Sequence, residues 1–236
     1  MKRSQFALLL LSMAAGGLPA IAKDGKARSA VKIACVGDSI TYGAGIKQRE
    51  TSSYPSQLGK LLGADFQVRN FGVSGATLMK KGNHPYWKTN AYESALSWKP
   101  DIVVIKLGTN DTKPGNWKHH EGLAGDLEEM IRTFRGLPTK PKIFLCLPAP
   151  AFPERWGIRD SVIKNELIPI IRRVAKEQRC PTIDIYSALE GKDHYFPDKI
   201  HPNKDGATVI AKSVYSALKI AAPAAAVKQP ATPAKN

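Results

Sequence analysis

The sequence predicts an α/β fold in which a mainly parallel β-sheet is covered by helices on both faces. Five short apolar segments, typical of buried strands, alternate along the chain with five longer amphipathic segments. Strand and helix patterns that alternate in this way indicate βαβ units, because parallel strands need crossover connections that are usually helical. No internal repeat or interdomain linker interrupts the alternation, so we expect one domain.

The predicted strands are apolar runs at residues 31–36, 66–71, 101–107, 142–147 and 182–185. The predicted helices have apolar residues spaced along one helical face, and they cover residues 54–62, 89–98, 122–134, 158–178 and 203–220. In sheets of this kind, ligands bind in the crevice at the carboxyl ends of the strands. The loops after the strands are therefore the predicted location of a functional site.

The first 22 residues are predicted to be a secretory signal rather than part of the domain. Lys2 and Arg3 precede an apolar run, and small residues at positions 20–22 are typical of a signal-peptidase cleavage site. A membrane anchor is the alternative, but the apolar run is short for a bilayer and is interrupted by glycines and a proline. We therefore expect a secreted or periplasmic protein without integral membrane contact.

The predicted domain extends over residues 23–221. Residues 222–236 are rich in Ala, Pro and Lys and have no apolar periodicity, which predicts a flexible tail. Within the domain, the buried free thiol is the expected state of Cys35, Cys146 and Cys180, and one disulfide is the alternative.

The composition excludes several classes of protein. The chain of 236 residues is 43% hydrophobic and 23% charged, so it has ample material for a core and is unlike a disordered protein. Three cysteines are too few for a disulfide scaffold or a multi-cysteine zinc module. The net charge of +15 favours contact with anionic polymers or surfaces, or gives a solvated basic face. No nucleic-acid-binding motif accompanies the charge, so no nucleic-acid partner is expected.

The first predicted strand ends in Gly37-Asp38-Ser39, which is a candidate nucleophile turn. Gly37 permits a sharp bend that presents the Ser39 hydroxyl above the sheet edge. The alternative is a plain turn, and the tripeptide alone does not exclude it. A dinucleotide site is disfavoured, because the glycines at 43 and 45 lack the third glycine and the helix start of a phosphate-binding fingerprint.

The second and third predicted strands end in segments that are able to bind an oxyanion. The second runs into a loop that contains Gly75, and the third runs into Gly-Thr-Asn-Asp, which contains Asn110. The Gly75 amide and the Asn110 side chain are both candidate hydrogen-bond donors to one negative oxygen, with ordinary turn chemistry as the alternative. Asp111 is either a second carboxylate of the site or, as we favour, a residue that orders the loop by accepting backbone amides.

A late loop supplies a candidate base and its partner. Asp198 and His201 are three residues apart, and Pro202 disfavours helical backbone at His201, so the two side chains can face each other in a tight loop. His201 is then able to meet Ser39 through its other ring nitrogen. A capping aspartate beside a surface histidine is the alternative. The pair His119-His120 has no accompanying carboxylate or cysteine pattern, so a metal site there is disfavoured.

Taken in this order, the four segments resemble the four sequence blocks of the SGNH hydrolases, also called the GDSL esterase/lipase family. The segments are Gly-Asp-Ser, Asn-x-Gly-x-Ser-Gly, Gly-Thr-Asn-Asp and Asp-x-x-His-Pro. The resemblance spans residues 31 to about 218, and no block is missing. The Gly-x-Ser-x-Gly elbow of the α/β-hydrolases is absent from the sequence.

The resemblance implies a flavodoxin-like three-layer α/β/α sandwich with a five-stranded parallel sheet. It implies Ser39 as nucleophile, His201 as base and Asp198 as the residue that orients it, with an oxyanion hole from the Ser39 and Gly75 amides and the Asn110 side chain. It implies neither a metal nor an organic cofactor. The expected activity is that of a secreted serine esterase acting on acetyl or other short acyl esters, with acetylated carbohydrate as the expected substrate.

Two other functions remain open from the sequence. One is a lipid esterase of the lysophospholipase or thioesterase type, and the other is a non-catalytic glycan-binding protein on the same fold. Aromatic residues flank both oxyanion segments, and their rings suit a sugar better than a long acyl chain. We therefore predict that substrate contacts Tyr86, Trp87 and Trp117, with packing of these rings against the domain as the alternative.

Overall fold

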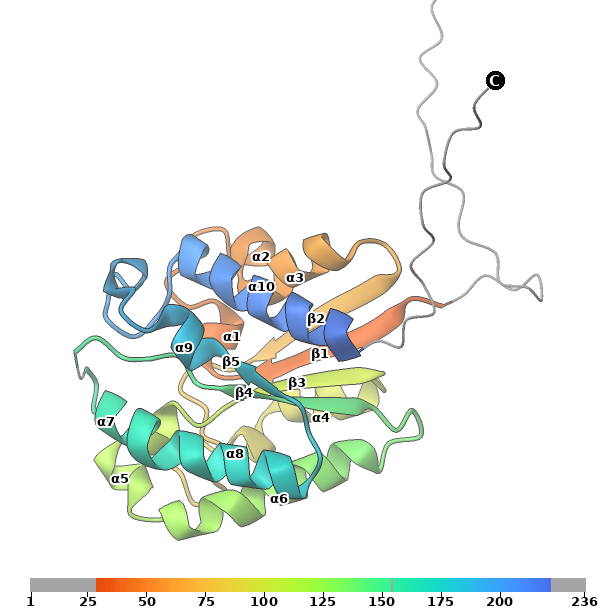
Figure 1. Cartoon of the computed structure of the whole chain (residues 1–236). Coiled ribbons are helices and arrows are strands. Elements are labelled where there is room, and N and C mark those ends of the chain that lie inside the picture. The colour runs from red at the N-terminus through yellow and green to blue at the C-terminus, as the bar shows by residue number, and fades with distance from the viewer. Residues whose placement is uncertain (1–28, 154, 222–236) are drawn as a thin grey trace, which may run out of the picture.

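A five-stranded sheet lies between two layers of helices in the computed structural model, which describes residues 29–153 and 155–221 (Figure 1). The strands pair in the order β2-β1-β3-β4-β5, and every pair is parallel. They are β1 (Val31–Gly37), β2 (Phe66–Gly72), β3 (Ile102–Lys106), β4 (Lys142–Leu147) and β5 (Thr182–Asp184). This strand order is flavodoxin-like, so the predicted fold is confirmed.

The helices divide between the two faces of the sheet (Figure 1). One layer contains α1 (Ser39–Tyr42), α2 (Arg49–Ser52), α3 (Tyr54–Leu62), α9 (Ile185–Leu189) and α10 (Lys204–Ala221). The other contains α4 (Asn90–Ser97), α5 (Pro114–Trp117), α6 (Leu123–Arg135), α7 (Asp160–Val162) and α8 (Ile168–Glu177). A π-helical turn, η4 (Ile163–Leu167), joins α7 to α8, and the 3-10 turns are η1 (Tyr86–Lys88), η2 (Asn110–Thr112), η3 (His120–Gly122) and η5 (Asp193–Tyr195).

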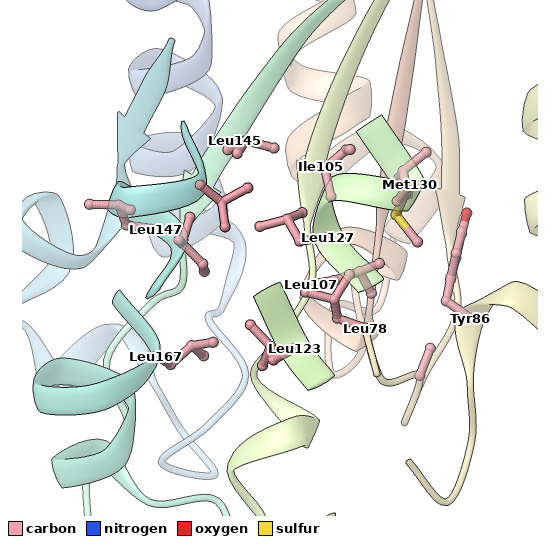
Figure 2. Close-up of a cluster of buried hydrophobic side chains, with 14 of the residues drawn as sticks. Leu78, Tyr86, Ile105, Leu107, Leu123, Leu127, Met130, Leu145, Leu147 and Leu167 are labelled. Atoms are coloured by element: carbon pink, nitrogen blue, oxygen red, sulfur yellow. The ribbon is translucent and has the colours of Figure 1, made fainter. Parts of the chain in front are cut away.

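Each face of the sheet has its own hydrophobic core, because successive strand residues point to opposite faces. Ala34 and Val36 of β1 belong to the core beneath α6 and α8, whereas Ile33 and Cys35 belong to the core beneath α3 and α10. Figure 2 shows part of the first core, in which leucines of α6 meet Ile105 and Leu145. Strands buried on both faces account for the continuous apolar runs in the sequence.

All five predicted strands and all five predicted helical regions are present, and their ends differ by a few residues. One difference has a clear cause: the last strand ends at Asp184, because the Asp184 side chain accepts the Ser187 amide and caps α9. The helices α1, α2, α5 and α9 were not predicted. Each has only four or five residues, which is too short to show helical periodicity.

The structure bears on two further predictions. Cys35, Cys146 and Cys180 are buried free thiols, as expected. Within the described residues, no helix is both long and apolar enough to span a bilayer. The predicted secretory signal at 1–22 and the predicted flexible tail at 222–236 lie outside the described residues.

Candidate active site

The strand order places the candidate site at the carboxyl ends of β1 and β3. After β1 the chain crosses to β2 on one side, and it later enters β3 on the other side of β1. The connections therefore diverge between β1 and β3, and such a switch point is where open α/β sheets bind ligands. Ser39 follows β1 and Asn110 follows β3, so both predicted functional side chains lie at this point.

The turn that carries Ser39 requires two glycines because the backbone passes very close to its neighbours. Gly37 pairs with Gly72 of β2 and with Lys106 of β3. A Cβ atom on Gly37 would lie 2.0 Å from the Thr41 hydroxyl oxygen, and one on Gly72 would lie 2.1 Å from the Tyr42 amide nitrogen. Neither space admits a side chain, so the sequence lets α1 pack directly against the strand ends.

Ser39, His201 and Asp198 form one hydrogen-bonded line. Nε2 of His201 lies 2.9 Å from Oγ of Ser39, and Nδ1 of His201 lies 2.7 Å from Oδ2 of Asp198. Ser39 and His201 are 162 residues apart in the sequence, and the fold brings them together. The predicted nucleophile, base and orienting carboxylate therefore meet with the geometry that transfer of the serine proton requires.

Asp198 is held as a carboxylate by its surroundings. Partial burial works to raise the pKa of Asp198, but hydrogen bonds from the His201 amide, the His201 ring and the Ile200 amide outweigh burial and bring the pKa below its usual value. A charged carboxylate fixes the ring with its proton on Nδ1. Nε2 is then the nitrogen that faces Ser39 as an acceptor.

The three predicted oxyanion donors lie on segments that follow the neighbouring strands β1, β2 and β3. Ser39 is the first residue of α1, so its amide has no acceptor within that helix. Gly75 has a φ of 79°, a conformation that favours glycine. The Asn110 side chain is 4% exposed, and its nitrogen donates one hydrogen bond to the Ala76 carbonyl at 3.1 Å. A side-chain amide nitrogen carries two hydrogens, so Asn110 retains a second one for a ligand.

Asp111 orders the loop that holds Gly75, as we favoured from the sequence. Its two carboxylate oxygens accept the amides of Leu78 and Met79 at 2.9 Å and 2.7 Å. The side chain is completely buried, and burial raises the pKa of Asp111 to about 7 despite these hydrogen bonds. Asp111 therefore ties the turn that carries Asn110 to the loop that follows Gly75.

Comparison with known proteins places this arrangement in a family. The model of the GDSL-like Lipase/Acylhydrolase family matches residues 35–209. The chain belongs to this family. It is 43% identical over 208 residues to an acetylxylan esterase of Xylanibacter ruminicola, a match that covers 80% of this chain and 43% of that protein. It is also 23% identical over 222 residues to a multidomain esterase of Ruminococcus flavefaciens, covering 80% of this chain and 28% of that protein.

Among solved structures, the fold is similar to that of a carbohydrate acetylesterase family member from Sinorhizobium meliloti. The TM-score is 0.62 at 22% identity, and the match covers 80% of this chain and 98% of that one. The chain spans less than half the length of the curated relatives it matches. The sequence comparisons thus show the family, and the likeness to the solved structure shows the fold.

One buried ion pair in this GDSL-like domain was not predicted. Nζ of Lys106 lies 3.1 Å from each carboxylate oxygen of Asp38 and 3.0 Å from Oγ1 of Thr109, and both charged side chains are 0% exposed. Asp38 also accepts the Ile40 amide at the start of α1. The sequence held one sign of this ion pair: a lysine inside an apolar strand run is expected to be buried, and a buried charge almost always has a partner of opposite charge.

Two of the three predicted substrate contacts are wrong. Tyr86 is 0% exposed, and its hydroxyl donates to the Phe71 carbonyl within the core (Figure 2). Trp117 is 7% exposed, and its indole nitrogen donates to Glu166. Burying a large aromatic ring contributes strongly to the stability of the fold, and here both rings are buried in the domain. Tyr86 has no exposed surface and Trp117 has little, so both rings pack in the domain instead of facing a substrate.

Trp87 is half-buried and lies against the same core. Its indole nitrogen donates to the Leu78 carbonyl at 2.7 Å, its ring packs on Tyr92, and Nζ of Lys80 lies 4.4 Å from its ring centroid. These contacts favour a packing role. Contact of Trp87 with a substrate stays an untested prediction.

Two of the remaining histidines have partners outside the triad. The His120 ring stacks on Trp117, and its Nδ1 is 2.8 Å from the Trp117 carbonyl. His194 packs on the ring of Tyr195. Among the residues that the structure describes, no group of three His, Cys, Asp or Glu side chains is placed to hold a metal ion. His84 lies next to the loop that holds Gly75, because a Cβ on Gly75 would lie 3.5 Å from its Nδ1.

Proposed function

We propose that this protein is a serine esterase that removes acetyl or other short acyl groups from carbohydrate. The observation that carries the proposal is the hydrogen-bonded line from Ser39 through His201 to Asp198. The acetylxylan esterase that is 43% identical over most of this chain supports acetyl esters of a polysaccharide as the substrate class. The predicted signal at residues 1–22 supports a secreted or periplasmic location.

In the first half of the proposed reaction, Oγ of Ser39 attacks the ester carbonyl carbon while Nε2 of His201 accepts the hydroxyl proton. The carbonyl oxygen becomes negative and is stabilised by the Ser39 amide, the Gly75 amide and the Asn110 side chain. The bond between the carbonyl carbon and the alcohol oxygen then breaks. His201 gives its proton to that oxygen, so the deacylated sugar leaves and Ser39 carries the acyl group.

In the second half, water replaces the alcohol. His201 takes a proton from the water as its oxygen attacks the acyl-serine carbonyl, and the same donors stabilise the new oxyanion. When the bond to Oγ breaks, His201 returns the proton to Ser39 and the carboxylic acid is released. Asp198 stabilises the positive imidazole in both halves, because it remains a carboxylate beside Nδ1.

The test is acetate release from a panel of natural acetylated glycans, with Ser39→Ala as the paired variant. We expect release from at least one glycan and a loss on the order of 10³-fold or more in the variant. The variant removes one small hydroxyl, so its melting temperature should stay close to that of the wild type. An unchanged rate in Ser39→Ala would overturn the proposal.

Acyl-chain preference distinguishes this proposal from a lipid esterase. We expect aryl acetate to be cleaved much faster than aryl octanoate, and the opposite order would indicate a lipid substrate. Glycan binding without turnover of any ester would indicate a non-catalytic binding protein.

A further inference from the structure

We propose that Trp156 forms a stacking platform for a sugar ring on the alcohol side of the ester. This inference rests on the proposed function and names a substrate-binding residue that the sequence did not suggest. Trp156 is 54% exposed, and of the large apolar side chains that the structure describes only Tyr42, Leu61 and Trp156 are exposed. An exposed indole near a reactive group is a candidate binding surface.

The indole lies directly beside the candidate base. The ring centroids of Trp156 and His201 are 5.5 Å apart, with an angle of 41° between the ring planes. His201 is the group that returns a proton to the leaving alcohol oxygen, so that oxygen must lie within hydrogen-bond distance of Nε2. In a carbohydrate ester the oxygen is attached to a sugar ring. A side chain that borders His201 is therefore placed to contact that ring.

A tight turn at the carboxyl end of β4 presents Trp156. Arg155 and Ile158 form an antiparallel bridge, and the Ile158 amide donates to the Arg155 carbonyl at 2.9 Å. Both residues between them have positive φ, 53° for Trp156 and 75° for Gly157. Asn, Asp and Gly are the residues that normally occupy these positions of a turn, and a bulky aromatic residue is strained there. Trp156 thus combines a strained backbone conformation with a largely exposed ring, a combination that points to a functional role.

The turn is attached to both halves of the candidate site. Nη1 of Arg155 donates to the Asp198 carbonyl at 3.4 Å, and the Phe152 amide donates to the Lys199 carbonyl at 2.8 Å. On the other side, the Arg159 side chain donates to the Thr112 carbonyl, at the end of the 3-10 turn that begins with Asn110. The turn that carries Trp156 is therefore tied to both the loop of Asp198 and His201 and the turn that begins with Asn110.

The chemistry around the indole fits a sugar better than an acyl chain. The guanidinium carbon of Arg155 lies 4.8 Å from the Trp156 ring centroid, so the platform combines an apolar face with a nearby hydrogen-bond donor. The C–H groups of a pyranose are able to pack on such a face while its hydroxyls reach the donor. A long acyl chain instead needs an enclosed pocket of aliphatic side chains.

The test compares two acetyl esters that differ only in the alcohol. One is an acetylated xylo-oligosaccharide and the other is ethyl acetate, whose alcohol has no ring to stack. We expect Trp156→Ala to lower kcat/KM about 10-fold on the oligosaccharide, in line with the size of aromatic contacts, and by less than about 2-fold on ethyl acetate. Trp156→Phe should restore most of the activity on the oligosaccharide. Leu61→Ala, which removes another exposed apolar side chain from α3, should change neither rate.

Equal losses on both esters would overturn the proposal and make Trp156 a residue that positions His201. No loss on the oligosaccharide would overturn it as well, and so would a loss confined to aryl octanoate. A binding measurement separates this proposal from the esterase activity. Calorimetric titration of the oligosaccharide into Ser39→Ala should detect binding, and adding Trp156→Ala should weaken it about 10-fold. Binding that is unchanged by Trp156→Ala would contradict the platform even if no ester were hydrolysed.

Discussion

Asp198 uses its two carboxylate oxygens for different tasks. Oδ1 accepts the amides of Ile200 and His201 at 3.0 Å and 2.7 Å, which fixes the loop, while Oδ2 accepts the His201 ring. The same three bonds lower the pKa of Asp198, so the carboxylate keeps its charge to lower pH than an ordinary aspartate. One residue thus both fixes the loop around His201 and supplies the negative charge beside its ring.

This arrangement predicts the pH dependence of the activity. Asp198 keeps its charge to low pH because its pKa is lowered, and the reaction needs a neutral imidazole, since a protonated one cannot accept the serine proton. We therefore expect kcat/KM on aryl acetate to rise with pH through one ionisation. Asp198→Asn should lower the rate by a factor on the order of 10³ or more, and it should move the midpoint to lower pH because it removes the charge that stabilises the imidazolium. A pH-rate profile checks this, with exposed His194→Ala as a control that should leave the profile unchanged.

Asn110 should act mainly in the transition state. Its amide is proposed to bond the oxyanion rather than the resting ester, so Asn110→Ala should lower kcat by roughly 10² to 10³ and leave KM nearly unchanged. The lost bond to the Ala76 carbonyl should reduce the free energy of unfolding by only about 1 kcal/mol. Steady-state kinetics and urea unfolding measure the two effects. A change confined to KM would place Asn110 in substrate binding, and Asn90→Ala on α4 serves as the neutral control.

At the scale of elements, the site depends on a link between two strand ends. Lys106, the last residue of β3, pairs with Asp38, which lies between β1 and α1, and also bonds Thr109 just before Asn110. The pair therefore joins the turn that carries Ser39 to the turn that carries Asn110. Both side chains are fully buried, so solvent could not compensate either charge if the opposite charge were removed.

Breaking this pair should be strongly destabilising. Lys106→Met leaves the Asp38 carboxylate buried without its partner, and the expected loss in the free energy of unfolding is about 3 to 5 kcal/mol. Adding Asp38→Asn should recover part of the loss, because the uncompensated charge is then gone. Urea unfolding of the two single variants and the double variant gives the coupling energy. Losses that simply add would show that the pair is not coupled.

At the scale of the whole molecule, strands, helices and the four polar segments were predictable because each is local in sequence. The order of the strands is not local: an apolar run shows that a strand is buried, and it does not show which strand lies beside it. The wrong predictions for Tyr86 and Trp117 have the same origin. Both rings lie near oxyanion segments in the sequence, but burial against distant core residues decides where they point. Trp156 was missed because its nearness to His201 arises only from folding.

The buried thiols should report how often the sheet opens, because they become reactive only when the fold around them opens. Cys35 in β1 and Cys146 in β4 are 0% and 2% exposed, and burial raises the pKa of Cys35 to about 12 and that of Cys146 further. Reagents attack the thiolate, so neither cysteine should react while the fold is intact. We expect labelling by a maleimide to proceed at the rate of global opening, with both sites modified together. Mass spectrometry over time in low urea would follow this, and fast labelling of Cys35 alone would reveal that β1 opens independently.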